Sequence, residues 1–226
     1  IIQFSRYLLL LKEKGAKITF KVRKDLHKLL STLQVDVNLT PYYPNYEEID
    51  FESPLLSLPY LFGTDIENIP IQQRYIYANK KKIIYWNKRL DNKKFKIGIN
   101  WHGSNNDKSF ELNNLKKIAE LPNVQLISLQ KGESEKDLNN IDFTIKSFNS
   151  EIDNNGDAFV DTAAIIVNCD LIITCDTSIA HLSGALGKKT WIVLKKIPDW
   201  RWMLNRSDTP WYNSAVLFRN TNIKNW

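Results

Sequence analysis

From Phe95 onward, apolar runs rich in β-branched residues alternate with segments of helical periodicity. Alternation of this kind predicts βαβ units with right-handed crossovers and a parallel sheet covered on both faces. The predicted strands cover residues 96–101, 124–129, 143–145, 171–175, 190–194 and 215–218, and the predicted helices cover 112–121, 133–140, 159–168 and 178–186. This part of the chain therefore predicts an α/β, doubly wound, Rossmann-like domain over residues 94–226.

The first 93 residues show the same alternation in incomplete form. Residues 2–14 predict a helix closed by Gly15, residues 17–22 a strand and residues 24–33 a second helix, with no strand before the opening helix. Five prolines divide residues 36–70 into irregular loops with short strands, and Asn79 is placed to cap a helix that runs to residue 90. We expect a truncated N-terminal α/β half over residues 1–78 and a linker helix over 79–93.

The composition is that of a globular protein, with 43% hydrophobic residues in 226. No apolar run is long enough to cross a bilayer. The two cysteines, Cys169 and Cys175, fit neither a disulfide framework nor a metal pattern, which indicates a reducing, cytoplasmic compartment. Because the chain does not begin with methionine, we expect it to be part of a longer protein.

The net charge of +6 is concentrated near the start of the chain. Residues 12–28 hold seven Lys or Arg residues and two acidic ones. A basic segment of this kind attracts anions, such as an acidic acceptor or the surface of the inner membrane, although such runs are more often simply a solvated lysine-rich surface. No motif for nucleic-acid binding accompanies it, so we expect no nucleic-acid partner.

Polar side chains follow the predicted strands of the second half at one edge of the sheet. Ligands of open parallel sheets bind at the carboxyl ends of the strands, where helix N-termini also point. The segments that follow four of these strands are His102-Gly103 with the loop to Lys108, Gln130-Lys131, Asp176-Thr177-Ser178 with His181 one turn later, and Asp199-Trp200-Arg201. The opposite edge receives ordinary linkers, so we expect a binding site at the carboxyl edge.

The pattern Asp176-Thr177-Ser178-x-x-His181 is suited to binding a phosphate or diphosphate. A buried strand delivers two hydroxyls to a helix N-terminus, whose free N–H groups and dipole favour an anion. His181 lies one turn along, on the same face as Ser178. Alternatively, a hydroxyl merely caps the helix and His181 is a core histidine.

Three further side chains are candidates for the same site. Lys108 and Lys131 are placed to balance the charge of a diphosphate. Arg201, between Trp200 and Trp202, is suited to stacking on a base or bonding a phosphate, although packing explains these tryptophans equally. By contrast, Asp161 at the start of a predicted helix is interpreted as structural.

Several sequence patterns are missing, which limits the chemistry. The chain has no G-x-G-x-x-G, no P-loop and no G-x-S-x-G nucleophile elbow. It also has no Asp-x-Asp pair, H-E-x-x-H or Cys/His cluster, so we expect no metal and no cofactor.

The run from Cys175 to Gly187 resembles the D-T-x-x-x-H-x-x-[AG]-A-x-G signature of glycosyltransferase family nine, the heptosyltransferase-like proteins. Other segments resemble the glycosyltransferase domain that follows tetratricopeptide repeats in bacterial proteins. These segments are residues 3–7, 53–59, 101–103, 128–132, 161–164, 198–202 and 207–212, so the resemblance extends over nearly the whole chain.

The resemblance implies a GT-B-like fold, with two Rossmann-like halves facing a cleft. It also implies metal-independent, inverting transfer from a nucleotide sugar to an unknown acceptor, which is a glycan, a lipid-linked sugar or a protein. In that picture the donor diphosphate or ribose lies against Asp176, Thr177, Ser178 and His181. Two departures stand out: relatives carry arginine where Lys108 stands, and the turn that supplies their catalytic carboxylate would lie upstream of Ile1.

Two other functions remain open at this stage. One is a non-catalytic domain that binds a nucleotide sugar or a protein partner and is attached to tetratricopeptide repeats. The other is an epimerase of the GT-B type that acts on a nucleotide sugar.

Overall fold

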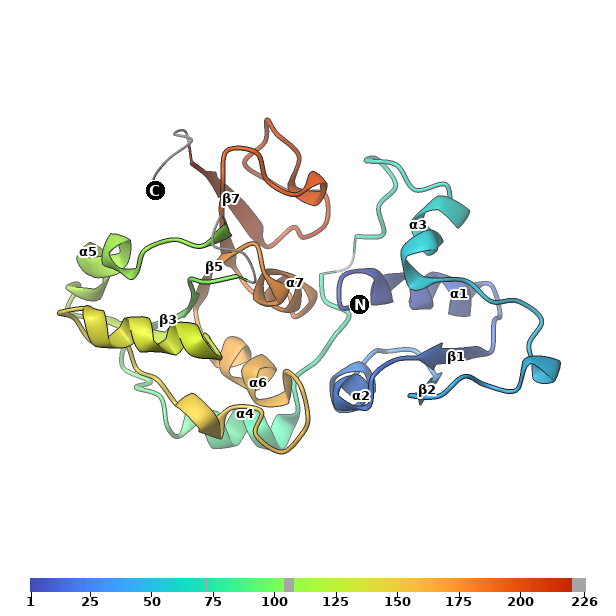
Figure 1. Cartoon of the computed structure of the whole chain (residues 1–226), viewed down its shortest axis with the longest axis horizontal. Helices are drawn as coiled ribbons and strands as arrows, with labels where there is room; N and C mark the ends of the chain where they lie inside the picture. Colours follow the sequence, from blue (N-terminus) through green and yellow to red (C-terminus); the bar gives the residue numbers. More distant parts are fainter. Residues whose placement is uncertain (72, 104–107, 221–226) are drawn as a thin grey trace.

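A computed structural model describes residues 1–71, 73–103 and 108–220 (Figure 1). The C-terminal part is built on a five-stranded sheet in the order β4-β3-β5-β6-β7, in which every pair is parallel. The strands are β3 (Phe95–Asn100), β4 (Val124–Ser128), β5 (Leu171–Cys175), β6 (Thr190–Leu194) and β7 (Ala215–Arg219). The predicted parallel sheet is therefore confirmed for this part.

Apolar side chains cover both faces of this sheet. Ile172 and Ile192 pack on the face covered by α4 (Lys80–Asn87), α6 (Val160–Asn168) and α7 (Ser178–Ala185). Leu171 and Ile173 point to the opposite face, where they belong to a second apolar cluster. That second face is covered by the 3₁₀ helix Leu112–Leu115, α5 (Lys116–Ala119) and the 3₁₀ helix Glu133–Asn140. All residues of β5 are buried because it is a central strand.

The N-terminal part holds a smaller sheet (Figure 1). Strands β1 (Ile18–Lys21) and β2 (Val37–Thr40) pair in parallel. The 3₁₀ helix Phe4–Arg6 leads into α1 (Tyr7–Glu13), which ends at Gly15 in the left-handed region with φ of 84°, as predicted. The other helices are the 3₁₀ helices Lys24–Leu26, Tyr46–Glu48 and Leu55–Ser57, and single turns at α2 (His27–Leu30) and α3 (Leu58–Leu61).

The predicted strand at residues 143–145 is wrong. The structure has only an isolated parallel bridge there, between Ile127 and Lys146. Two hydrogen bonds hold it, from Ser128 N to Lys146 O and from Lys146 N to Leu126 O, at 2.8 and 2.9 Å. The apolar run is too short to continue the ladder, so β4 is the last strand on that side among the described residues.

Predicted helices are also shorter than expected at two places. Residues 112–121 form a 3₁₀ turn followed by one α-turn, and residues 24–33 do the same. Both segments have their apolar residues at helical spacing but lack a side-chain cap at the start. By contrast, Asn79 caps α4 as predicted, accepting hydrogen bonds from the N–H groups of Lys81 and Lys82.

One apolar core runs through both parts of the chain. It joins residues of α1 and α2 to residues of α6, α7 and the segment before β7. In the part of the chain that the structure describes, no helix has the length and apolarity needed to span a membrane.

Candidate functional site

The site lies where the strand order reverses. β3 pairs with β4 on one side and with β5 on the other. The chain leaves β3 toward one face of the sheet, where Leu112 is buried, and leaves β5 toward the opposite face, where α7 packs. The connections that follow β3 and β5 therefore diverge to opposite faces of the sheet and leave a crevice between the carboxyl ends of these two strands. Such a crevice is the usual ligand site in open α/β sheets.

Asn100, the last residue of β3, joins the ends of three strands. Its buried amide N–H donates to Oε1 of Gln130, after β4, at 2.8 Å. Its Oδ1 accepts from the hydroxyl of Thr177, after β5, at 2.7 Å, and from that of Thr174 at 3.2 Å. The amide therefore holds the three loops in register at the carboxyl edge.

Thr177 is the N-cap of α7. Its Oγ1 accepts from the N–H of Ile179 at 3.2 Å while its hydroxyl proton is directed to Asn100. This hydroxyl therefore positions the helix. Because the N–H of Ala180 also donates, to the carbonyl of Thr177 at 3.1 Å, the N–H of Ser178 and the helix dipole are what the first turn offers an anion. Ser178, the first residue of the helix, is exposed at the same edge.

Lys108 and Asp176 form an ion pair across the crevice. The ammonium lies 2.7 Å from Oδ2 of Asp176, and the two side chains are 30% and 11% exposed. With Val193, Leu194, Lys195 and Pro198 they line a small depression that contains about 190 Å³ of space, part of it open to solvent. Lys108 thus lies beside the segment that follows β5, at the edge where its place in the sequence predicts it.

His181 lies one turn into α7, between two aromatic residues. Its Nδ1 is 3.0 Å from the hydroxyl of Tyr212, and its ring stacks on Trp202 with centroids 5.3 Å apart and planes 14° from parallel. Burial lowers the pKa of His181 to about 4, an effect that Asp176 opposes. The imidazole is therefore neutral at pH 7.

Asp199 and Arg201 lie where the two parts of the chain meet. Asp199 caps the 3₁₀ helix Trp200–Trp202 and pairs with the guanidinium of Arg201 at 2.8 Å. Burial would raise the pKa of Asp199, but hydrogen bonds from Arg201 and the charge of Lys108 hold it below its ordinary value. Nε of Arg201 donates to Gln3 at 2.7 Å, and its guanidinium lies over the Trp200 and Phe4 rings. Arg201 thus bridges the two parts.

The remaining predicted residues support the loops of this edge. Oε1 of Gln130 also accepts from the N–H of His102 at 3.0 Å, and the N–H of Gly103 donates to Ser109 at 3.4 Å. The ammonium of Lys131 donates to the carbonyl of Ile152 at 2.6 Å, so no contact in the described residues joins it to Lys108 or Asp176. Its role toward a diphosphate stays a prediction.

Sequence reasoning missed three residues of this region. Asn100 carried a signal, because it is a polar residue at the end of an otherwise apolar strand. Tyr212 and Arg6 lie in the segments 207–212 and 3–7, which carry the family resemblance, but no local pattern places them near α7, because they come together only through the folding of distant segments. Among the described residues, no group of three His, Cys, Asp or Glu side chains is arranged to hold a metal ion.

The fold is similar to two solved glycosyltransferase structures. The glycosyl transferase family 9 protein of Veillonella parvula aligns with a TM-score of 0.55 at 12% identity, over 96% of this chain and 60% of that one. The ADP-heptose LPS heptosyltransferase II of E. coli aligns with a TM-score of 0.51 at 14% identity, over 70% of this chain and 49% of that one. The present chain therefore spans about half to three fifths of those two chains.

Other comparisons give no match. No model of a protein family matches the chain, and no curated protein is similar to it in sequence. The likeness to the two structures confirms the expected fold, a mixed α/β architecture with parallel sheets similar to that of GT-B glycosyltransferases.

Proposed function

We propose that this chain binds the diphosphate of a nucleotide sugar at the crevice between β3 and β5 and acts in glycosyl transfer. The observation that carries the proposal is the ion pair of Lys108 and Asp176 beside the N-terminus of α7. It lies at the reversal of the strand order in a fold shared with glycosyltransferases.

The chemistry of these groups suits a departing diphosphate. Asp176 neutralises Lys108, and the ammonium can exchange that carboxylate for phosphate oxygens. The N-terminus of α7 adds partial positive charge beside this ion pair. Glycosyl transfer requires stabilisation of the leaving nucleoside diphosphate, and these groups supply it as charge builds on the oxygens. The base that activates the acceptor is not among the residues assigned here.

Calorimetry with nucleoside diphosphates tests the proposal directly. The chain is titrated with ADP, UDP, GDP and CDP at up to millimolar concentration, with ADP first because a structural neighbour is an ADP-heptose enzyme. We expect one of them to bind, and we expect Lys108→Ala to weaken that binding by about tenfold or more, the usual effect of losing a charge-assisted hydrogen bond.

Lys116→Ala is the matched control. Lys116 also pairs with an aspartate of the C-terminal part, Asp142, but on exposed α5 and not at the carboxyl edge. This variant should bind as the wild type does. If no nucleoside diphosphate binds to the wild type, the proposed function is wrong.

The same samples separate transfer from the two alternatives. An epimerase converts its nucleotide sugar without any acceptor, whereas a transferase needs one. A binding domain shows neither conversion nor transfer. Because Lys108 and α7 supply positive charge themselves, we expect binding of the diphosphate to persist in excess EDTA.

The proposal also includes four more detailed expectations from the sequence. They are inverting stereochemistry, attachment to tetratricopeptide repeats, a cytoplasmic location and contact of residues 12–28 with an anionic surface. Within that segment, Arg23 pairs with Asp25, Lys28 pairs with Asp157, and Lys21 lies 3.0 Å from the ring centroid of Tyr43. Sedimentation with anionic and with neutral lipid vesicles tests the last expectation.

A further inference from the structure

The imidazole of His181 is held by groups outside its own helix. Trp202 lies against one face of the ring, and the hydroxyl of Tyr212 contacts Nδ1 at 3.0 Å. Nε2 has no hydrogen-bond partner among the described residues. With Nδ1 engaged and one face covered, Nε2 is the polar atom of this half-buried ring that remains for a ligand.

The ring of Tyr212 packs closely against α7 at Gly184, and this packing fixes its position. A Cβ atom on Gly184 would lie 2.4 Å from two carbon atoms of the Tyr212 ring, so only glycine lets the ring lie across the helix at that point. On the side of Tyr212 facing the N-terminal part, the guanidinium of Arg6 lies 4.8 Å from the ring centroid. Tyr212 is 2% exposed, so its position is fixed on every side by packing.

The direction of the hydrogen bond between Tyr212 and His181 follows from the groups around the hydroxyl. Burial raises the pKa of Tyr212 well above its ordinary value, so its hydroxyl keeps its proton at pH 7. Nδ1 of His181 lies 3.0 Å away and has no other partner among the described residues. The hydroxyl of Tyr75 is the other neighbour of this group, but it already accepts from Arg6 at 3.1 Å and donates to the carbonyl of Ile2 at 3.2 Å, so Nδ1 is the acceptor with the closer and less occupied geometry. Arg6 itself can only donate. A proton on Nδ1 would therefore deprive the buried Tyr212 hydroxyl of its best acceptor.

We propose that Tyr212 is a positioning residue: its hydroxyl donates to Nδ1 of His181 and so holds the neutral imidazole with its proton on Nε2, as a donor toward the bound diphosphate. The inference rests on the proposed function for the identity of the ligand. No bond is made or broken in this step, because the proton stays on Nε2 throughout.

A neutral donor fits the charges around this ring. Arg6 and Arg201 lower the pKa of His181, and only Asp176 among its neighbours raises it. A third cation would be repelled by the two arginines, whereas an N–H dipole is not. His181 can thus hydrogen-bond a phosphate oxygen without first taking up a proton.

Long-range ¹H–¹⁵N NMR of the histidine rings tests the inference without any ligand. The chain has three histidines, so the His181 signals are assigned by their loss in His181→Gln. In the wild type at pH 7 we expect a protonated Nε2 and an unprotonated Nδ1. In Tyr212→Phe, which keeps the ring and removes the hydroxyl, we expect a mixture of the two tautomers. A proton on Nδ1 in the wild type, or an unchanged tautomer in Tyr212→Phe, overturns the proposal.

Tyr7→Phe is the matched control, because it also removes a buried tyrosine hydroxyl. The hydroxyl of Tyr7 bonds Thr64 at 3.0 Å in the N-terminal part. It should leave the His181 signals unchanged, which separates positioning from general loosening of the fold. If Tyr212→Phe does not fold, the wild-type tautomer alone decides the question.

Binding provides the second readout. For the nucleoside diphosphate that the wild type binds, Tyr212→Phe should weaken affinity about two- to tenfold, as expected for a poorly oriented hydrogen bond, and Tyr7→Phe should not. Unchanged affinity in Tyr212→Phe overturns the proposed role toward the ligand. Failure of the wild type to bind any nucleoside diphosphate instead overturns the proposed function, while the tautomer measurement still decides whether Tyr212 orients His181.

Discussion

At the scale of single residues, the contacts at the carboxyl edge separate the side chains that we propose contact a ligand from those that hold the loops. Lys108, Asp176 and His181 belong to the first group: Lys108 and Asp176 line the depression, and Nε2 of His181 has no hydrogen-bond partner among the described residues. Thr177 and Gln130 belong to the second, because their polar atoms are engaged with Asn100 and with backbone N–H groups. Sequence spacing placed all five at one edge, but it could not distinguish their roles, since those depend on partners from other strands.

Gly184 allows a direct test of the packing that places Tyr212. Replacing it with alanine favours the helix by up to about 1 kcal/mol, but the new Cβ meets a rigid ring that is itself fully packed. We expect Gly184→Ala to lower the free energy of unfolding by about 1 to 3 kcal/mol, measured by urea denaturation.

Gly98→Ala is the comparison for this prediction. Its Cβ would meet the methyl ends of Ile172 and Leu129 at 2.8 and 2.9 Å, and flexible side-chain ends can move aside. The cost should therefore be smaller than for Gly184→Ala. Equal costs would contradict the explanation based on the Tyr212 ring.

His181 also predicts how stability depends on pH. Its pKa is about 4 in the folded chain, against about 6.5 when unfolded. Between these values the unfolded state binds a proton that the folded state does not, so stability falls as the pH falls from 6.5 to 4. The charged side chains around the ring are Asp176, Arg201 and Arg6.

At pH 5 the loss due to His181 should be at most about 2 kcal/mol relative to pH 7, and less to the extent that solvent reaches the half-buried ring. The measurement is urea denaturation at both pH values for the wild type and for His181→Gln, which does not titrate. The variant should lose less stability between pH 7 and pH 5 than the wild type. An identical loss would show that His181 is not neutral in the folded protein.

At the scale of elements, the five strands of the large sheet were predictable, whereas the further strand predicted at 143–145 was wrong and two predicted helices are shorter than expected. β3 to β7 follow from apolar runs that only a buried parallel sheet explains. The segment at 112–119 was predicted as one helix, but its 3₁₀ start reflects a missing cap, and the packing of Leu112 and Leu115 on the sheet determines its shape. The order of the strands in the sheet creates the crevice, and this order depends on tertiary contacts that no local sequence pattern predicts.

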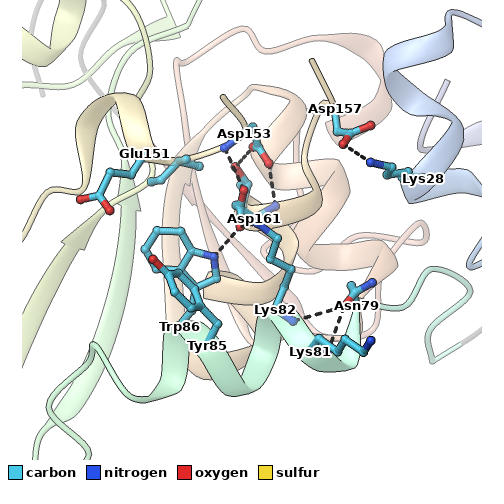
Figure 2. A network of polar contacts seen from close by, with 12 residues as sticks. Lys28, Asn79, Lys81, Lys82, Tyr85, Trp86, Glu151, Asp153, Asp157 and Asp161 are labelled. Atoms are coloured by element: carbon cyan, nitrogen blue, oxygen red, sulfur yellow. Dashed lines mark hydrogen bonds and ion pairs between the residues drawn. The ribbon is translucent and has the colours of Figure 1, made fainter. Parts of the chain in front are cut away.

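The buried carboxylate of Asp161 in α6 binds two side chains of α4 (Figure 2). It accepts from the indole N–H of Trp86 at 2.7 Å and lies 2.9 Å from the ammonium of Lys82. Its Oδ2 also accepts from the N–H of Asp153, whose own carboxylate accepts from the N–H of Asp161 at 2.6 Å and so caps α6. These contacts agree with the structural interpretation of Asp161.

Asp161→Ala should therefore destabilise the fold by about 2 to 4 kcal/mol, because it leaves buried donors without an acceptor. Lys82→Ala removes only the ammonium of a side chain that is 36% exposed and leaves the indole and backbone donors to Asp161 in place, so it should cost less than Asp161→Ala. Chemical denaturation followed by tryptophan fluorescence measures both. Comparable costs for the two variants would contradict the assignment of the stability to the buried hydrogen bonds.

For the whole molecule, the two parts of the chain are joined by contacts of very different kinds. At one point Lys28 pairs with Asp157 at 2.6 Å on the surface. At another, the guanidinium of Arg6, which is 1% exposed, donates to the carbonyls of Gln3, Pro70 and Trp211 and to the hydroxyl of Tyr75. Sequence patterns predicted two α/β parts, but they could not show that a buried arginine near the start of the chain joins them beside the candidate site.

Because Arg6 is buried and the Lys28–Asp157 pair is exposed, we expect the contacts of Arg6 to contribute more to the stability of the fold. Arg6→Lys keeps the charge but replaces a planar fork with a point cation, which cannot reach the same carbonyls and cannot stack on Tyr75 and Tyr212 in the same way. We expect it to lower the free energy of unfolding by about 2 to 4 kcal/mol, measured by guanidinium denaturation. Lys28→Ala should cost less than about 1 kcal/mol, because an exposed pair is well solvated in both states. If Arg6→Lys costs no more than Lys28→Ala, the two parts are held together by their apolar core alone, and Arg6 does not fix the position of Tyr212.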